Sequence, residues 1–380
     1  MILIEHGPKG RPALFDRPRQ RLIAQALNEV QPVLEQAEAA RRAGLWVAGY
    51  LAYEAGYAFE PRLEQLWVPS ARPLIDLRLY DTPSAAADIV AQARHAARDI
   101  RLAPLDPAIP RATYDTAFTQ LQTYIRAGDC YQINLTFPVH TQLEAGTALG
   151  LYGALRKRQT VGFGAYLDLG GGAAIVSRSP ELFFQIKGDT LESRPMKGTA
   201  PRSADPREDA RLKAALAASE KVQAENLMIV DLLRNDIGRI SRIGTVRVPE
   251  LFAIESFATV HQMSSRVQGQ LRDAAGLPDL MAALFPCGSV TGAPKIRAMQ
   301  IIAELEHSPR GAYCGAIGWA APDGDQCWSV AIRTLQIAPD GHIRADVGGG
   351  VVQDSTAQGE WEEALWKMRY AQALTTPVCT

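Results

Sequence analysis

Residues 161–177 read VGFGAYLDLGGGAAIVS, and this stretch decides the fold class. Two β-leaning segments, near 161–168 and 173–177, flank the three consecutive glycines at 170–172. That arrangement predicts a tight turn between two antiparallel strands. Segments with helical spacing and further β-leaning segments alternate on both sides of it. The pattern therefore predicts an α+β fold with largely antiparallel sheets.

Outward from this hairpin, helices and strands are expected in mixed order. A continuous apolar run at 45–53 is typical of a buried strand. We expect helices over 18–43 with an interruption at Pro32, and over 114–127, 147–158, 207–235, 294–306 and 359–374. We expect strands near 131–141, 243–248, 312–319, 326–337 and 342–352. Three prolines within 104–110 disfavour helix there, so we place a boundary between residues 1–110 and 111–380.

The composition of the chain excludes several classes of protein. Its 380 residues include 40 Lys and Arg, 41 Asp and Glu, and 47% hydrophobic residues. The apolar content excludes disorder across the chain. The nearly equal numbers of basic and acidic residues exclude nucleic-acid binding through bulk positive charge. No apolar run approaches the roughly 18 residues of a transmembrane helix, and the N-terminus lacks the features of a secretory signal. The five cysteines show no C-x-x-C spacing, which favours reduced thiols in a cytoplasmic protein. They are Cys130, Cys287, Cys314, Cys327 and Cys379.

A lysine between proline and glycine is the most unusual local feature. Residues 193–199 read SRPMKGT, so Lys197 lies where the backbone turns after a β-leaning stretch. A lysine amine is a nucleophile where its surroundings lower its pKa, although the spacing alone also fits a solvated turn lysine. Upstream, Glu181 follows a Ser-Pro pair and is either a general acid or base, or an exposed turn glutamate.

Acidic residues on two expected helices are candidate metal ligands. Glu225 begins a nearly solid apolar stretch, and it either has a functional role or forms an i,i+4 ion pair with Lys221. Near the C-terminus, Glu360, Glu363 and Lys367 share one helical stripe at i, i+3 and i+7. Glu363 and Lys367 either form an i,i+4 surface ion pair, or the helix of Glu225 and this C-terminal helix face each other and supply oxygen ligands for Mg²⁺.

Two glycine-rich stretches are candidate ligand-binding segments. Residues 288–295 (GSVTGAPK) precede a helix whose free N–H groups suit an anion, although the spacing is not that of a P-loop. The three glycines at 348–350 follow a β-leaning segment and either let backbone amides approach a ligand or form an ordinary turn. Arg333, in an apolar stretch, needs a carboxylate partner within the protein or on a ligand. No feature predicts a nucleotide, haem or flavin.

Six motifs occur in an order that resembles the chorismate-utilising enzymes. They are PMKGTAPR (195–202), ENLMIVDLLRNDIGR (225–239), GSVTGAPKIRAMQIIAELE (288–306), IRTL (332–335), GGGVVQDS (348–355) and E-x-x-E-x-x-x-K (360–367). The resemblance covers roughly residues 112–375, and GYLAYE at 49–54 is similar as well. It implies an α/β sandwich of two large antiparallel sheets with helices outside. Segment 1–110 would complete that sandwich, and 111–380 would be the chorismate-binding catalytic domain.

The resemblance also implies roles for individual residues. Lys197 would be the nucleophile and Glu181 the general acid. Mg²⁺ would be held by Glu225 and Glu363, with Glu360 nearby and acting through water, and would bind the ring carboxylate of chorismate. The positions that match substrate contacts in the family are Thr199, His261, Thr291, Tyr313, Arg333, Gly349, Gly350 and Lys367. Among these, Arg333 would hold the enolpyruvyl carboxylate.

The residue before Gly-Thr separates the chemistries within this family. Members that place nitrogen at C4 of chorismate carry lysine, whereas those that make anthranilate, isochorismate or salicylate carry alanine. Lys197 therefore implies addition at C2 and then ammonia attack at C4, giving 4-amino-4-deoxychorismate for 4-aminobenzoate and folate synthesis. The alternatives are anthranilate formation and a non-catalytic chorismate-binding subunit, which would lack Glu181, Lys197 or a metal carboxylate.

The chain departs from the family pattern in a few places. Met196 replaces the usual isoleucine, a nearly volume-conserving change. The N-terminal region is shorter than that of relatives with a tryptophan pocket, so we expect no such pocket. No Cys-His-Glu amidotransferase set is found, so ammonia is expected from a separate glutamine amidotransferase subunit. The chain ends soon after the last motif, so no fused lyase is expected, nor is a nucleic-acid or membrane partner.

Overall fold

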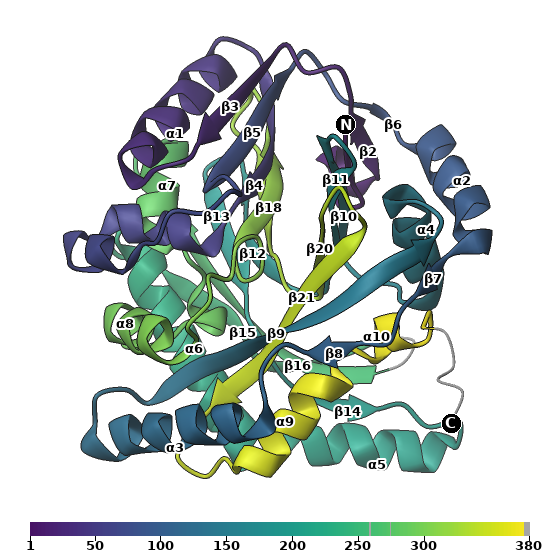
Figure 1. The fold of residues 1–380 in the computed structure, drawn as a ribbon. Coiled ribbons are helices and arrows are strands. Elements are labelled where there is room, and N and C mark those ends of the chain that lie inside the picture. The colour runs from purple at the N-terminus through teal and green to yellow at the C-terminus, as the bar shows by residue number, and fades with distance from the viewer. Residues whose placement is uncertain (258–259, 274, 376–380) are drawn as a thin grey trace.

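Two large antiparallel sheets face each other in the computed structural model, and helices surround them (Figure 1). The structure describes residues 1–257, 260–273 and 275–375. Every pairing between the named strands is antiparallel. The predicted α+β sandwich of two antiparallel sheets is therefore confirmed.

The first sheet joins the N-terminal strands to a long central pair. Its strands, in spatial order, are β17 (Gly292–Ala293), β9 (Gln132–Ala145), β21 (His342–Val351), β20 (Thr334–Ile337), β11 (Ala173–Ser179), β10 (Phe163–Gly170), β1 (Ile2–Ile4), β2 (Ala13–Phe15) and β6 (Ser84–Ala85), while β7 (Arg101–Leu102) and β8 (Asp106–Pro107) also pair with β9. The hairpin of β10 and β11 contains the predicted glycine turn. Because β1 pairs with β10, the start of the chain extends this sheet.

The second sheet has ten strands, and β14 among them carries Lys197. In spatial order they are β14 (Met196–Pro201), β16 (Val260–Gln270), β13 (Thr190–Arg194), β12 (Leu182–Lys187), β19 (Gln326–Val330), β18 (Ala316–Ala320), β4 (Trp46–Leu51), β5 (Ile75–Tyr80) and β3 (Gln20–Ala24), and β15 (Arg247–Ser256) also pairs with β16. The expected buried strand at 45–53 is β4, which pairs with β18 and β5.

Side chains from both sheets fill the space between them. Ile2 of the first sheet and Tyr50 and Trp319 of the second belong to one buried cluster. Leu3, the next residue along β1, belongs to a separate and larger cluster. Adjacent residues of a strand point to opposite faces, so both faces of these strands are buried. Burial on both faces explains why 45–53 is apolar throughout rather than alternating.

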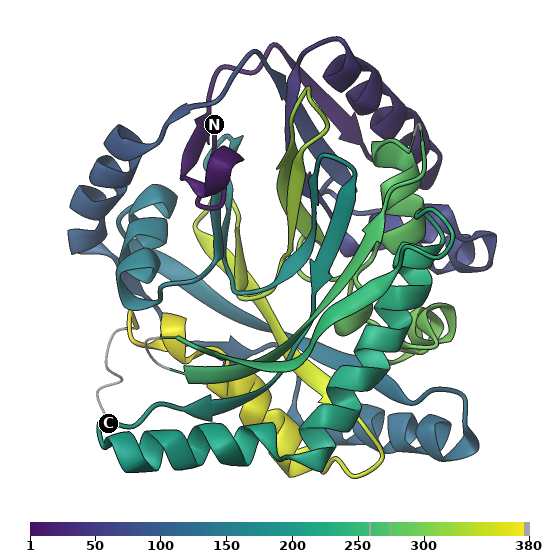
Figure 2. The ribbon, with the colours of Figure 1, turned by 180° about the vertical axis from the view of Figure 1, so that it is seen from behind.

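Helices cover the outer faces of the sheets (Figure 2). They are α1 (Leu27–Arg42), α2 (Ala87–Ala96), α3 (Arg111–Ala127), α4 (Ala148–Arg158), α5 (Pro206–Ala217), α6 (Glu220–Gly238), α7 (Leu277–Leu284), α8 (Lys295–Leu305), α9 (Ala357–Trp366) and α10 (Arg369–Gln372). Short 3₁₀ turns are η1 (Pro8–Gly10), η2 (Tyr53–Phe59), η3 (Pro61–Leu66), η4 (Ala97–Asp99) and η5 (Gly288–Val290). In both views α1 and α7 lie on one side and α2 and α4 on the other.

The structure corrects the helix expected over 18–43. Residues 20–24 form β3 instead, with Leu22 and Ala24 buried on one face and their neighbours exposed. This alternation has the period of a strand rather than of a helix. Pro32 lies inside α1 and does not interrupt it, because a proline removes only one backbone donor and the buried face of the helix compensates for that loss.

Two other expected helices are each divided in two. The helix expected over 207–235 is α5 followed by α6, because Ser219 begins a new helix and its Oγ accepts a hydrogen bond from the N–H of Val222 at 3.4 Å. The helix expected over 359–374 is α9 followed by α10. The glycines at 348–350 lie within β21 rather than after it.

The described residues include no helix that has both the length and the apolar character needed to cross a bilayer. Four cysteines are buried with free thiols, as expected from their spacing, namely Cys130, Cys287, Cys314 and Cys327. Cys379 lies outside the described residues.

Candidate active site

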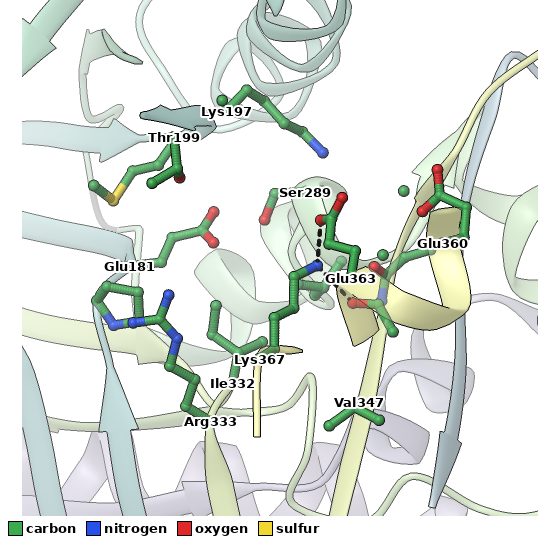
Figure 3. Close-up of a pocket in the computed structure, with 18 of the residues that line it drawn as sticks. Glu181, Lys197, Thr199, Ser289, Ile332, Arg333, Val347, Glu360, Glu363 and Lys367 are labelled. Atoms are coloured by element: carbon green, nitrogen blue, oxygen red, sulfur yellow. Dashed lines mark hydrogen bonds and ion pairs between the residues drawn. The ribbon is translucent and has the colours of Figure 1, made fainter. Parts of the chain in front are cut away.

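A cavity of about 260 Å³ lies where β14, β21, α6 and α9 come together. Side chains of both charges point into it from different elements (Figure 3). The charged residues that line it are Glu181, Lys197, Lys221, Glu225, Arg333, Asp346, Glu360, Glu363 and Lys367. The concentration of charge in one hollow marks this cavity as the candidate site.

Lys197 reaches the cavity from β14, and a β-bulge sets its direction. The pairing of β14 with β16 shifts register between Lys197 and Thr199, so Gly198 is an extra residue in the strand. Gly198 has φ +68°, and a Cβ at this position would lie 2.3 Å from Cγ1 of Val222. Both the conformation and the space therefore require glycine beside the candidate nucleophile.

The surroundings of Lys197 favour its neutral form. Burial lowers the pKa of this amine, the carboxylates of Glu225 and Glu181 oppose that shift, and the ammonium of Lys367 adds to it. The net direction is downward, so a larger fraction of the amine is neutral than in an exposed lysine. Lys197 is therefore not the solvated turn residue that its spacing also allowed, and a neutral amine can act as a nucleophile.

Glu181 is a buried carboxylic acid on the wall of the same cavity. It precedes β12, and its backbone N–H donates to Oγ of Ser179 at 3.2 Å. One carboxylate oxygen, Oε1, is buried without a hydrogen-bond partner. Burial raises the pKa of Glu181, against a hydrogen bond from Ser289 and the charges of Lys197 and Arg333. Both shifts favour the forms that general acid and nucleophilic chemistry require, a proton on Glu181 and a neutral amine on Lys197, in one cavity.

The C-terminal helix α9 brings two carboxylates and an ammonium over Gly349. A Cβ built at Gly349 would lie 3.0 Å from Glu360 Oε2, 3.3 Å from Lys367 Nζ and 3.8 Å from Glu363 Oε1. The absence of a side chain at Gly349 leaves room for these groups. Lys367 Nζ donates to the carbonyl of Gly348 at 2.8 Å and lies 2.9 Å from Glu363 Oε1.

The pKa values of the two carboxylates of α9 are shifted in opposite directions. The ammonium of Lys367 lowers the pKa of Glu363. Burial raises the pKa of Glu360, although Oγ of Ser355 donates to its Oε1 at 2.6 Å. The nearby charge of Glu363 raises it further. Two acids that repel each other in this way gain from a cation placed between them.

Glu225 lines the cavity from α6, across from α9. The sequence also allowed an ion pair between Glu225 and Lys221, but the structure shows no such pair among the residues it describes. The donor set of Glu225, Glu360 and Glu363 suits Mg²⁺, which prefers oxygen ligands and keeps several waters. The described residues hold no cluster of three acidic, histidine or cysteine side chains close enough to enclose a metal. The magnesium site expected from the sequence therefore stays a prediction.

Arg333 supplies positive charge at a position away from the acidic helix. Its backbone has φ +51°, in the left-handed region, and its carbonyl accepts a hydrogen bond from the N–H of Arg178 at 2.9 Å. The guanidinium lines the cavity and forms no ion pair with any described residue. A half-buried arginine without an internal partner is suited to bind an anionic ligand.

All but two of the predicted site residues line this cavity. Those that do are Glu181, Lys197, Thr199, Glu225, Tyr313, Arg333, Gly349, Gly350, Glu360, Glu363 and Lys367. The imidazole of the buried His261 bonds Oγ of Ser256 at 2.8 Å and Oδ1 of Asp209 at 3.1 Å. The hydroxyl of Thr291 donates to the carbonyls of Cys287 and Gly288. Neither His261 nor Thr291 is among the residues that line the cavity.

Lys295, at the end of segment 288–295, is held by internal bonds, and the anion-binding role expected of the free N–H groups at this helix start stays a prediction. Nζ of Lys295 donates to Asp236 Oδ2 at 2.6 Å and to the carbonyl of Leu284 at 2.9 Å. The ammonium thus fixes α8 to α6. The segment still contributes Ser289 and Val290 to the cavity wall.

The sequence analysis did not identify Gln132 or Tyr370. Gln132 is fully buried, both polar atoms of its amide are without a hydrogen-bond partner, and Nε2 would lie 2.7 Å from a Cβ at Gly350. Tyr370 lines the cavity with a buried, unpartnered hydroxyl. Neither residue stands in a charged or glycine-rich stretch, so only their burial without partners distinguishes them.

Known proteins resemble this chain in sequence and in fold. The family model described as chorismate binding enzyme matches residues 2–373. Aminodeoxychorismate synthase component 1 of Klebsiella aerogenes is 43% identical over 305 residues, covering 80% of this chain and 67% of the relative. Anthranilate synthase component 1 of Streptomyces coelicolor is 42% identical over 261 residues, covering 69% of this chain and 51% of the relative.

A solved structure extends the likeness to the whole fold. Anthranilate synthase component I from Streptococcus pneumoniae superposes with a TM-score of 0.80 at 25% identity, covering 94% of this chain and 91% of that one. The chain spans 67% and 51% of the lengths of the two curated relatives named above, and about a third of some longer ones.

Proposed function

Since the chain belongs to the chorismate binding enzyme family, we propose that it is an aminodeoxychorismate synthase component I. The reaction is chorismate plus ammonia to 4-amino-4-deoxychorismate, a step toward 4-aminobenzoate and folate. One observation carries the proposal: the amine of Lys197 lies in a charged cavity where burial lowers its pKa, and the acid Glu181 lines the same cavity. The 43% identical aminodeoxychorismate synthase component 1 of Klebsiella aerogenes supports it.

The two residues perform complementary parts of one substitution. The neutral amine of Lys197 adds at C2 of chorismate, the ring double bonds shift, and the C4 hydroxyl leaves as water with a proton from Glu181. Ammonia then adds at C4, the double bonds shift back, and the amine of Lys197 leaves C2. Because the amine of Lys197 occupies C2 in the adduct, ammonia adds at C4.

The charges around the cavity orient the substrate. Arg333 holds the enolpyruvyl carboxylate, because its guanidinium has no ion-pair partner among the described residues. The ring carboxylate lies toward Glu360, Glu363 and Lys367, where carboxylates and an ammonium converge over Gly349. Fixing both ends of the ring sets C2 against the amine of Lys197, and this positioning itself accelerates the reaction.

The proposal includes magnesium, because a cation would reduce the repulsion between the carboxylate of the substrate and the acidic side chains of α9. Glu225 and Glu363 would hold it, with Glu360 acting through water. When bound, it neutralises charge on the ring carboxylate. The mutual repulsion of Glu360 and Glu363 and the bare backbone of Gly349 support this assignment.

The source of ammonia is a partner subunit in this proposal. The relatives' designation as component 1 supports a second component, which would be a glutamine amidotransferase. We place the reaction in the cytoplasm, in agreement with the four buried free thiols.

Product analysis tests the proposal directly. The purified chain is incubated with chorismate, Mg²⁺ and an ammonium salt, and products are identified by liquid chromatography and mass spectrometry. We expect 4-amino-4-deoxychorismate, which yields 4-aminobenzoate only when a lyase is added. Anthranilate would instead support the second candidate, which the 42% identity to an anthranilate synthase component 1 favours. If no product forms, addition of a glutamine amidotransferase subunit separates a partner-dependent enzyme from a binding-only protein.

Variants of Lys197 test the covalent route. Lys197→Ala should abolish or greatly slow product formation, and Lys197→Arg should do the same, because a guanidinium keeps the charge but is not a nucleophile. Lys187→Ala, which changes an exposed lysine at the end of β12, is the matched control. An unchanged rate in Lys197→Ala would contradict the covalent route.

A further inference from the structure

Tyr370 has a polar group in the cavity with no function assigned to it. It lies on α10 and lines the cavity together with Ile332, Arg333 and Met368. Its hydroxyl is buried, and no described residue is within hydrogen-bond distance of it. A buried hydroxyl without a partner is costly, so a tyrosine held in this way on a cavity wall indicates a partner that comes from outside the chain.

Arg333 is the charged group with the strongest influence on Tyr370. Burial raises the pKa of the phenol, and the charges of Arg333 and Arg178 oppose that shift; burial lowers the pKa of Arg333, and Tyr370 and Glu181 oppose that shift. Both residues line the same cavity, and neither the phenol O–H nor the guanidinium has an acceptor among the described residues. A phenol O–H beside a guanidinium can satisfy one carboxylate, with each oxygen receiving donors.

The distribution of charge indicates which carboxylate of the substrate binds at the end of the cavity near Arg333. Glu360 and Glu363 approach the cavity over Gly349, together with Lys367, which forms an ion pair with Glu363. The end near Arg333 has Glu181 as its nearby carboxylate, and burial raises the pKa of that group. An anionic group at this end therefore meets donors and a carboxyl group whose burial favours its neutral form.

We propose that the Tyr370 hydroxyl donates a hydrogen bond to the same substrate carboxylate that Arg333 binds, and that it thereby determines affinity for a substrate with a carboxylate on its C3 side chain. This inference rests on the proposed function, under which that group is the enolpyruvyl carboxylate of chorismate. Tyr370 binds and positions the substrate, and no proton is transferred to or from it.

The Tyr370→Phe variant tests this assignment, because it removes one oxygen and leaves the ring in place. A hydrogen bond to a charged group in a buried site is worth roughly tenfold or more in affinity. We expect KM for chorismate to rise about tenfold with kcat changed less than about twofold, since the contact is made equally in the ground and transition states. A loss of kcat at unchanged KM, or no change in either constant, would overturn the proposal.

Tyr80→Phe is the matched control. Tyr80 lies on β5, outside the cavity, and its buried hydroxyl also has no hydrogen-bond partner. The chemical change is the same, so a general effect on packing would appear in both variants. An equal rise in KM in Tyr80→Phe would show that removal of a buried hydroxyl, and not a lost contact with substrate, causes the effect.

A binding measurement separates this inference from the proposed activity. In the Lys197→Ala background, calorimetry with chorismate and Mg²⁺ reports the dissociation constant without turnover. Adding Tyr370→Phe should raise that constant about tenfold, whichever product the unmodified chain makes. An equal dissociation constant would refute the role of Tyr370 even if 4-amino-4-deoxychorismate is formed. A weakened constant in a chain that makes anthranilate would refute only the proposed activity.

Discussion

The amine of Lys197 lies 3.3 Å from the point at which a Cβ atom would stand on Gly350. The amide nitrogen of Gln132 lies 2.7 Å from the same point. Strand β21 thus has no side chain at Gly350, the position that the amine of Lys197 and the amide of Gln132 approach. A side chain at this position would compete with both groups for the same space.

Gly350→Ala should therefore slow the reaction. The backbone of Gly350 is not in the left-handed region, so alanine brings only a steric conflict, first with the amide of Gln132 and then with the amine of Lys197, and both groups have to move. A displacement of about 1 Å at a reacting group can cost about 100-fold in kcat. Steady-state kinetics with chorismate and ammonium measure the change.

Gly238→Ala provides the control for that substitution. A Cβ at Gly238, the last residue of α6, meets no atom within 4 Å. Its kcat and thermal unfolding temperature should match those of the unmodified chain. If Gly350→Ala retains full kcat while folding normally, the amine of Lys197 does not have to occupy the observed position.

The pH dependence of the rate should follow Lys197 and Glu181. The rate rises with pH as Lys197 loses its proton, and burial lowers the pKa at which this happens. The rate falls at higher pH as Glu181 loses its proton, and burial raises that pKa. A profile of kcat/KM against pH should be bell-shaped. Glu181→Gln should lower kcat by about 10²–10⁴-fold and remove the alkaline decline. A decline that persists in Glu181→Gln would belong to another group.

Glu363→Gln should weaken the dependence on magnesium without unfolding the chain. The side chain is 57% exposed and lies 2.9 Å from Lys367 Nζ, so the substitution removes charge but no buried packing. The concentration of Mg²⁺ that gives half-maximal rate should increase. Glu362→Gln, on the same helix but outside the cavity, is the control and should titrate like the unmodified chain. Identical magnesium titrations for both variants would remove Glu363 from the metal site.

Glu54 should make the stability of the chain depend on pH. Its carboxylate is buried, accepts hydrogen bonds from the N–H groups of Arg310 at 2.6 Å and Gly311 at 3.0 Å, and has its pKa raised by burial to about 7. The folded state then binds a proton that the unfolded state releases. The free energy of unfolding should therefore fall as pH rises from about 4.5 to about 7, by on the order of 3 kcal/mol.

Urea unfolding at pH 5 and pH 8 checks this effect. Glu54→Gln has no carboxyl proton to lose, so its free energy of unfolding should change less between the two pH values than that of the unmodified chain. Glu64→Gln, on the exposed face of η3, should behave like the unmodified chain. A Glu54→Gln variant with the full pH dependence would place the titrating group elsewhere.

Much of the fold follows from local sequence. The glycines at 170–172 predicted the hairpin of β10 and β11, because glycine alone adopts the required positive φ at little cost. Apolar continuity predicted β4. The error at 18–43 has a physical cause as well, since a short run near a helix gives too few positions to separate a period of 2 from one of 3.6.

The residue types needed for the chemistry were also predictable from sequence. Lys197 and Glu181, the acidic residues at 225, 360 and 363, and the glycines of β21 stand in short motifs. Their order along the chain was enough to indicate the family. The sequence could not show that these motifs line one cavity, because they lie on elements far apart in the chain.

Tertiary structure alone decided the state and surroundings of those residues. The lowered pKa of Lys197 and the raised pKa of Glu181 arise from burial, which depends on how the sheets and helices pack around them. The sequence also does not show that the hydroxyl of Tyr370 and the amide of Gln132 lack hydrogen-bond partners, since this depends on which residues surround them in the folded chain. Sequence thus determined which functional groups the protein has, and packing decided which of them meet, in which protonation state, and with which hydrogen bonds left for a ligand.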